Sequence, residues 1–139
     1  MGMIIKADYF MLDQDGILRP IIYVHSGKEL ENNAISINAP LAKALQPVSP
    51  KFRAIRLQSI LQKIVQELPT DSTICEFDAV FNPQYKIDVL TMLISACKAN
   101  SFSVLWPGTY EDGRLIYAVE GRPDYKIYDI NNYDVTVII

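Results

Sequence analysis

The feature that most constrains the fold of this chain is an alternation of short apolar runs with longer helical runs. The apolar runs lie at residues 34–37, 72–81 and 101–106, and residues with helical spacing separate them. Strands that alternate with helices are typical of βαβ units, in which helices cover a parallel sheet. The chain has 139 residues, the size of one domain. We therefore expect a single α/β domain over residues 1–139, with a mostly parallel sheet flanked by helices.

Two segments predict the main covering helices. In the first, Ser49-Pro50 pairs an N-cap candidate with a proline at the first helical position, and apolar residues then recur with helical spacing. In the second, from about Gln84 to Ala99, apolar residues nearly surround the helix, which predicts that most of it is buried. A shorter helix is expected at residues 39–46, with Asn38 as its cap.

Additional strands are expected near both ends of the chain. Apolar runs at residues 3–12 and 17–24 flank Asp13–Gly16, whose Asp-Gly pair is a turn signal. This pattern predicts an N-terminal β-hairpin; the alternative is that residues 1–33 extend the sheet. Glu111–Gly113 is a second turn signal, and it predicts a C-terminal hairpin that continues into the strand Arg114–Val119.

Composition narrows the classes of function. Charged residues make up 21% of the chain and its net charge is −3, so neither a disordered acidic tail nor a basic nucleic-acid coat is expected. Cys75 and Cys97 lack the spacing of a metal or redox motif, and His25 is the only histidine. Charges interrupt the apolar start, and no apolar run reaches about 18–20 residues, so we expect a cytoplasmic protein without a leader or a membrane span.

Charge is unevenly distributed along the sequence. Every ionisable residue between positions 39 and 66 is basic, whereas the last third of the chain is acidic on balance. The cations of this basic middle segment are Lys43, Lys51, Arg53, Arg56 and Lys63. The segment is either an ordinary solvated face, a patch for an acidic partner or for DNA phosphates, or one side of a head-to-tail contact between copies of the chain.

A Gly-Lys pair, Gly27-Lys28, follows the apolar run that ends at Val24. In a phosphate-binding loop, backbone N–H groups and the lysine bind the phosphates, and a hydroxyl binds magnesium. Here Ile22 stands where the first glycine is required, and Glu29 replaces the hydroxyl residue. The pair is therefore either a degenerate loop for ATP or GTP with magnesium, or an ordinary surface turn.

A second candidate site lies within the apolar run at residues 72–81. This run predicts a buried strand, whose alternation places Glu76 and Asp78 on one side, opposite Phe77. Two carboxylates near the end of a buried strand are suited to holding magnesium. The alternative is that one of them caps or pairs locally. No Ser-His-Asp or Cys-His set is evident, so no catalytic residue is assigned.

Several short stretches from Ala34 onward form a recognisable set. They are Ala34–Asn38, Phe81–Pro83 with Lys86 and Asp88, Leu105–Gly108, Gly113–Ala118 and Gly121–Tyr125. In these stretches the chain resembles the small P-loop protein of type 3 BREX phage-defence systems. The resemblance implies a P-loop-NTPase-like fold, with an intact phosphate loop before the Ala34–Asn38 stretch and an aspartate at or near Cys75. This chain departs from both expectations.

The departures imply a P-loop relative that keeps the scaffold and has lost its catalytic parts. We therefore expect a non-catalytic subunit of an anti-phage defence system that assembles with larger defence proteins or with itself. Two alternatives stay open. One is an active NTPase that uses Lys28 on phosphates and Glu76 or Asp78 on magnesium. The other is a DNA-contacting module that uses the basic middle segment.

Overall fold

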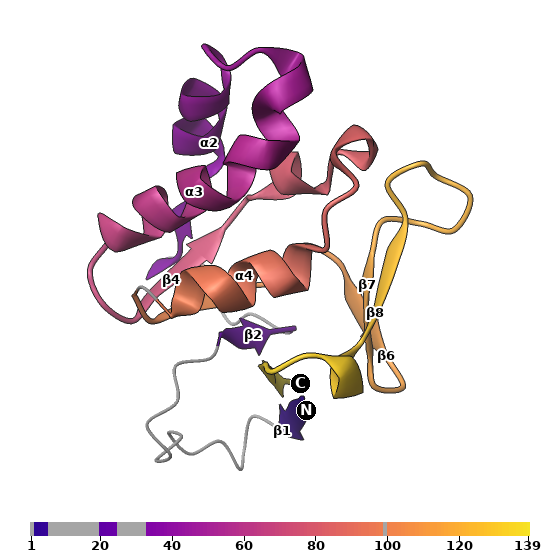
Figure 1. The fold of residues 1–139 in the computed structure, drawn as a ribbon. Helices are drawn as coiled ribbons and strands as arrows, with labels where there is room; N and C mark the ends of the chain where they lie inside the picture. Colours follow the sequence, from indigo (N-terminus) through magenta and orange to yellow (C-terminus); the bar gives the residue numbers. More distant parts are fainter. Residues whose placement is uncertain (1, 6–19, 25–32, 99) are drawn as a thin grey trace.

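The computed structural model of the chain describes residues 2–5, 20–24, 33–98 and 100–139 (Figure 1). Its centre is a six-stranded sheet in the order β1-β9-β2-β5-β4-β3, in which all neighbouring strands are parallel. The strands are β1 (Met3–Ile5), β2 (Ile21–Tyr23), β3 (Ile35–Ser36), β4 (Ser72–Cys75), β5 (Phe102–Leu105) and β9 (Thr136–Ile138). The prediction of an α/β fold with a mostly parallel, helix-flanked sheet is confirmed.

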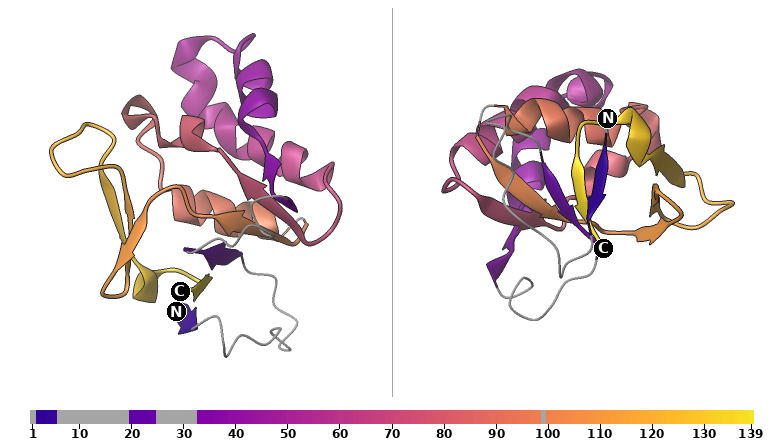
Figure 2. Two further views of the ribbon diagram at one scale, coloured as in Figure 1. Left: turned by 180° about the vertical axis from the view of Figure 1, so that it is seen from behind. Right: turned by 90° about the horizontal axis from the view of Figure 1, so that it is seen from below.

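Three helices lie on one face of this sheet: α2 (Asn38–Leu45), α3 (Arg53–Gln66) and α4 (Val89–Cys97) (Figures 1 and 2). The chain moves from β3 to β4 through α2 and α3, and from β4 to β5 through α4. Both steps go in the same direction across the sheet, so right-handed crossovers put all three helices on one face. A 3-10 turn, η2 (Pro50–Phe52), leads into α3.

The helical spacing expected after Pro50 is confirmed, because Leu57, Leu61 and Val65 of α3 are fully buried. The expected start of the following helix at Gln84 is wrong. The turns η3 (Asp78–Phe81) and η4 (Pro83–Tyr85) precede α4 instead. Lys86 has a left-handed backbone (φ +52°), which stops the helix from starting before Asp88, whose carboxylate accepts a hydrogen bond from Thr91 N and caps α4.

The expected Asn38 and Ser49 side-chain caps are also wrong. Asn38 is the first residue inside α2, whose N-cap position is Ile37, and no side chain bonds to that end of the helix. Ser49 occupies the N-cap position of η2, but its side chain makes no capping hydrogen bond. The Ser49-Pro50 pair therefore begins a 3-10 turn through the fixed φ of the proline alone.

The expected N-terminal hairpin is wrong. Both β1 and β2 pair with β9 in parallel, so β9 lies between them. All three residues of β9 are buried, and its position lets Val137 pack beside Ile22 in the sheet interior. A turn signal acts only on neighbours in sequence, whereas burial favours the most apolar strand available from anywhere in the chain. The expected Asp13–Gly16 turn lies outside the described residues.

The C-terminal hairpin is confirmed and extended. β6 (Thr109–Glu111), β7 (Arg114–Tyr117) and β8 (Lys126–Asp129) form a separate antiparallel sheet. Asp112 and Gly113 both have positive φ (+49° and +78°), as a two-residue hairpin turn requires. A single buried cluster joins both sheets and the helices, with Leu115 and Tyr128 contributing from the smaller sheet. None of the helices in the described part of the chain is long and apolar enough to cross a bilayer.

Candidate functional site

The carboxyl ends of the parallel strands meet at one edge of the large sheet. The connection after β2 leads to β3 at the far side of the sheet, whereas the connection after β5 passes β2 to reach β9. Ligand sites of open α/β sheets lie where successive connections leave in opposite directions. The ends of β2, β5 and β4 therefore define the candidate site. Gly27-Lys28 follows β2 in the sequence, but its placement lies outside the described residues.

The residues of β2 occupy the position at which a phosphate-binding loop would begin. Ile22, at the position where the first glycine of such a loop is required, is a fully buried residue in the middle of the strand. Its neighbours in the sheet are Val104 and Val137, which are also fully buried. After β2, the chain stays paired for one more residue, since Val24 N donates to Ile138 O (3.0 Å). In the sequence, two residues then separate Val24 from Gly27.

The end of β4 differs from the expected continuous strand. Ile37 N donates to the carbonyl oxygen of Cys75 (3.1 Å), and the strand stops there because Glu76 has a left-handed backbone (φ +54°). The expected alternation, with Glu76 and Asp78 on one side of a strand, is therefore wrong. Burial and, to a smaller extent, the Glu76 charge raise the pKa of the Cys75 thiol, which keeps it protonated.

The two carboxylates beyond β4 have different partners. Ser36 Oγ, on the edge strand β3, donates to Glu76 Oε2 (3.1 Å). Tyr117 OH, on β7 of the smaller sheet, donates to Asp78 Oδ2 (3.0 Å). No group of three or more His, Cys, Asp or Glu side chains that could hold a metal ion occurs among the residues that the structure describes. Each acid is thus hydrogen-bonded to a separate element, Glu76 to β3 and Asp78 to β7.

An aromatic cluster, defined by Phe81, Trp106, Tyr117 and Tyr128, connects this edge to the smaller sheet. The backbone of Trp106 donates to Tyr23 O (3.0 Å) and its Nε1 donates to Ile116 O (3.0 Å). Phe81 stacks on Tyr117 with 3.7 Å between ring centroids and meets Trp106 edge-on at 5.7 Å. Burial and the hydrogen bond to Asp78 raise the pKa of Tyr117 to about 12, so its hydroxyl stays a donor at neutral pH.

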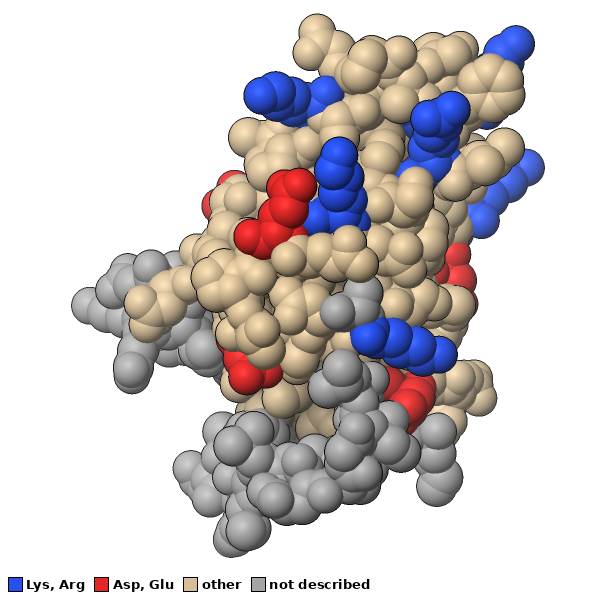
Figure 3. Space-filling model, turned by 60° about the vertical axis from the view of Figure 1, so that its left-hand side comes forward, with Lys and Arg blue, Asp and Glu red and all other residues tan. Residues whose placement is uncertain are grey.

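The cations of the basic middle segment have different surroundings. Arg53 Nε donates to Leu45 O (3.2 Å) and Val48 O (3.0 Å), so this side chain holds the turn between α2 and η2. Lys51 Nζ lies over the Phe52 ring, 5.1 Å from its centroid. Lys43 and Lys63 line a hollow between α2 and α3 that also contains Glu67. Figure 3 shows Lys and Arg side chains gathered on the upper part of the molecule, where α2 and α3 lie, with few acids among them.

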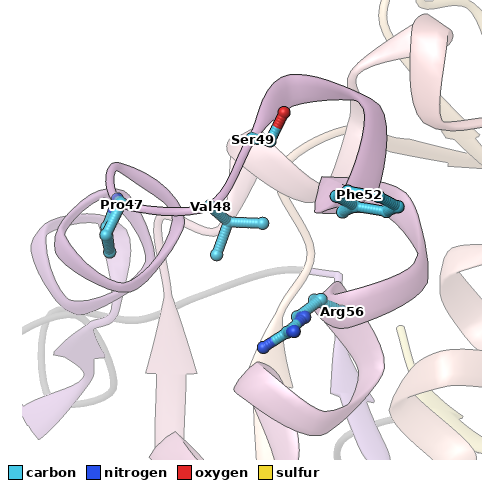
Figure 4. A pocket seen from close by; sticks show the side chains of 5 residues that line it. All are labelled: Pro47, Val48, Ser49, Phe52 and Arg56. Atoms are coloured by element: carbon cyan, nitrogen blue, oxygen red, sulfur yellow. The ribbon is translucent and has the colours of Figure 1, made fainter.

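The same region exposes large apolar side chains, which the sequence analysis did not identify. Phe52 is 47% exposed and Ile55 is 78% exposed. We call Val48, Phe52, Ile55 and Arg56 the η2–α3 surface. Val48, Phe52 and Arg56 surround a hollow of about 300 Å³, also lined by Pro47 and Ser49 (Figure 4). The sequence signal was present, because Ile55 falls outside the buried stripe of α3, between two arginines.

Comparison with protein-family models, with curated proteins and with solved structures found no match to this chain. The fold defines the class of this protein: an α/β protein with a parallel sheet, in which the connections after the central strands β2 and β5 leave in opposite directions. Such sheets carry many unrelated functions, so the side chains at the site decide between them. Two features bear on function: tethered carboxylates at the strand ends, and an exposed apolar surface with cations around it.

Proposed function

We propose that this protein is a non-catalytic, P-loop-like subunit of a bacterial anti-phage defence system of the BREX type, and that it acts by protein assembly. Its partners in this proposal are larger proteins of the same system and further copies of itself. The resemblance of the stretches from Ala34 onward supports the defence role. The central position of β2, which Gly27-Lys28 follows in the sequence, supports a P-loop-like scaffold.

The observation that supports the non-catalytic part is that the two acids after β4 are hydrogen-bonded to different elements. Glu76 is bound by Ser36 of the large sheet, and Asp78 is bound by Tyr117 of the small one. In phosphoryl transfer, magnesium bridges the phosphates and must be held by protein oxygens beside them. Here the last residue of β4 is Cys75, whose thiol is neutral, and each nearby carboxylate accepts a hydrogen bond from another element of the fold.

The observation that supports assembly is the η2–α3 surface. A monomeric protein exposes single apolar side chains without penalty, but neighbouring apolar residues on one helix face mark contact sites. Ile55 and Arg56 lie three and four positions after Phe52, a spacing that brings each of them next to Phe52 on a helix surface. Aromatic and arginine side chains are also those that contribute most to protein interfaces.

Calorimetry with ATP or GTP in the presence of magnesium tests the non-catalytic part. We expect no binding heat at millimolar nucleotide, for the wild type and for Lys28→Ala alike. Binding that Lys28→Ala abolishes, and that the matched control Lys98→Ala leaves intact, would contradict the proposal. Co-purification with the products of neighbouring defence genes tests the assembly part. We expect it in the wild type and expect Phe52→Asp to remove it.

One observation favours a second candidate function, an active NTPase. Glu76 holds a left-handed backbone, which costs roughly 1–2 kcal/mol for a residue other than glycine. Such conformations cluster at active sites. In this candidate, Lys28 contacts phosphates while one of the two acids holds magnesium. Magnesium-dependent binding that both Lys28→Ala and Glu76→Ala remove would favour it over the assembly proposal.

A further inference from the structure

The loop between β7 and β8 projects from the molecule (Figure 1) and exposes one large apolar side chain, Val119. Residues 118–125 extend beyond both sheets (Figures 1 and 2). Arg122 N donates to Val119 O (3.1 Å), which closes a four-residue turn with Gly121 (φ +95°) at its third position. This is the arrangement of a type II turn. Tyr125 N donates in the same way to Arg122 O (3.2 Å), so a second turn follows immediately.

This double turn presents one apolar and one acidic side chain together. Val119 is 67% exposed at the start of the first turn, and the exposed Glu120 follows it. The neighbouring Arg122 is neutralised by Asp124, whose Oδ1 lies 3.3 Å from Arg122 Nε. Glu120 makes no ion pair within the described part of the chain, so its charge is available. Because the turn is fixed by its own hydrogen bonds, binding through it loses little conformational entropy.

The η2–α3 surface matches this turn in polarity and in charge. Its hollow of about 300 Å³ has an apolar wall formed by Val48 and Phe52. Arg56 lines the same hollow, and its guanidinium makes no hydrogen bond or ion pair within the described residues. The hollow can therefore receive an apolar side chain next to a carboxylate, which is the pair that Val119 and Glu120 offer.

We infer that the η2–α3 surface binds the Val119–Glu120 turn of a second copy of this chain. Val119 enters the hollow beside Phe52, and Glu120 pairs with Arg56. The turn and the hollow belong to different parts of the molecule, so the contact is head-to-tail and propagates into a ring or an open filament. This inference deepens the proposed assembly function, and rests on it, by naming the chain itself as one of the partners.

Sedimentation velocity from micromolar to millimolar protein tests the contact with charge reversals. We expect concentration-dependent association in the wild type, weakened at least about tenfold by Arg56→Glu or by Glu120→Arg alone. The double variant R56E/E120R restores the pair with opposite signs and should recover most of the association. The matched controls Lys98→Glu and Glu111→Arg reverse exposed charges elsewhere and should change little.

Val119→Asp provides an independent arm, because it removes the apolar part of the contact. We expect it to abolish association while leaving the melting temperature unchanged, since the side chain is largely exposed. A wild type that stays monomeric throughout, or a double reversal that fails to restore association, would overturn the inference. If a monomeric wild type still co-purifies with a neighbouring defence protein, only this inference fails. If the wild type does not co-purify with any neighbouring defence protein, the proposed function itself is contradicted.

Discussion

The structure assigns Asp78 a structural role that can be measured through Tyr117. We expect Tyr117→Phe to keep the ring stack on Phe81, which has a centroid distance of 3.7 Å, and to remove only the 3.0 Å hydrogen bond to Asp78. Hydrogen bonds to charged groups contribute about 1.5–3 kcal/mol. Asp78 is exposed to solvent, which reduces this value, so we expect a loss of about 1 kcal/mol in the free energy of unfolding.

The raised pKa of Tyr117 sets an upper limit on the same interaction. A rise from 10.0 to about 12 corresponds to roughly 3 kcal/mol, and burial is its largest cause, followed by Asp78. Because the folded pKa lies above the unfolded one, this stabilisation is fully present below pH 10. It is lost as the pH rises from 10 to about 12. The stability advantage of the wild type over Tyr117→Phe should therefore be constant at neutral pH and shrink in that alkaline range.

Urea denaturation of the wild type, Tyr117→Phe, Asp78→Ala and the double variant gives the coupling energy directly. We expect about 1 kcal/mol of coupling and no effect of magnesium on any of the four proteins. Coupling within error of zero would refute the structural role of Asp78. A stabilisation by magnesium that disappears in Asp78→Ala would instead show that this carboxylate is a metal ligand.

Two further predictions concern the joints of the fold. Asn100 Nδ2 donates hydrogen bonds to Val65 O (2.9 Å) and Leu68 O (3.0 Å) at the end of α3. We therefore expect Asn100→Ala to lower the free energy of unfolding, measured by urea denaturation, by about 1–2 kcal/mol. An unchanged denaturation midpoint would show that water replaces both hydrogen bonds. Gly108→Ala should lower the free energy of unfolding by more than about 2 kcal/mol, because a Cβ there would lie 1.9 Å from Ile116 O. In Gly121→Ala the new Cβ meets open space, so only the positive φ of this residue is unfavourable. Equal melting temperatures for these two variants would contradict the packing around Gly108.

The parts of the fold that were predictable are those with local signals. The helical spacing of Leu57, Leu61 and Val65 identifies α3, and the Asp112-Gly113 pair identifies the β6–β7 turn. The position of β9 between β1 and β2 was not predictable, because an apolar pattern indicates burial and does not select a neighbour in the sheet. β8 was missed because Tyr128 is the only buried residue of this short strand, which makes its alternation a weak signal.

At the candidate site, the sequence indicated which residues matter but not what they contact. Glu76 and Asp78 were identified from their place after an apolar run. Their partners, Ser36 and Tyr117, lie 40 and 39 residues away in the sequence, and only the folded topology brings them together. The end of β4 at Cys75 could not be predicted either. It depends on the left-handed backbone of Glu76, and glutamate is not a residue that indicates such a conformation.

The most direct test of the proposed assembly function is phage protection by a complete operon of the proposed defence type in which this gene carries single changes. The account predicts that Lys28→Ala protects as well as the wild type, because nucleotide turnover is not required. It predicts that Phe52→Asp and Ile55→Asp each lose protection while the proteins stay folded, because they alter exposed side chains of the η2–α3 surface. Loss of protection in Lys28→Ala, together with full protection in Phe52→Asp and Ile55→Asp, would contradict the account.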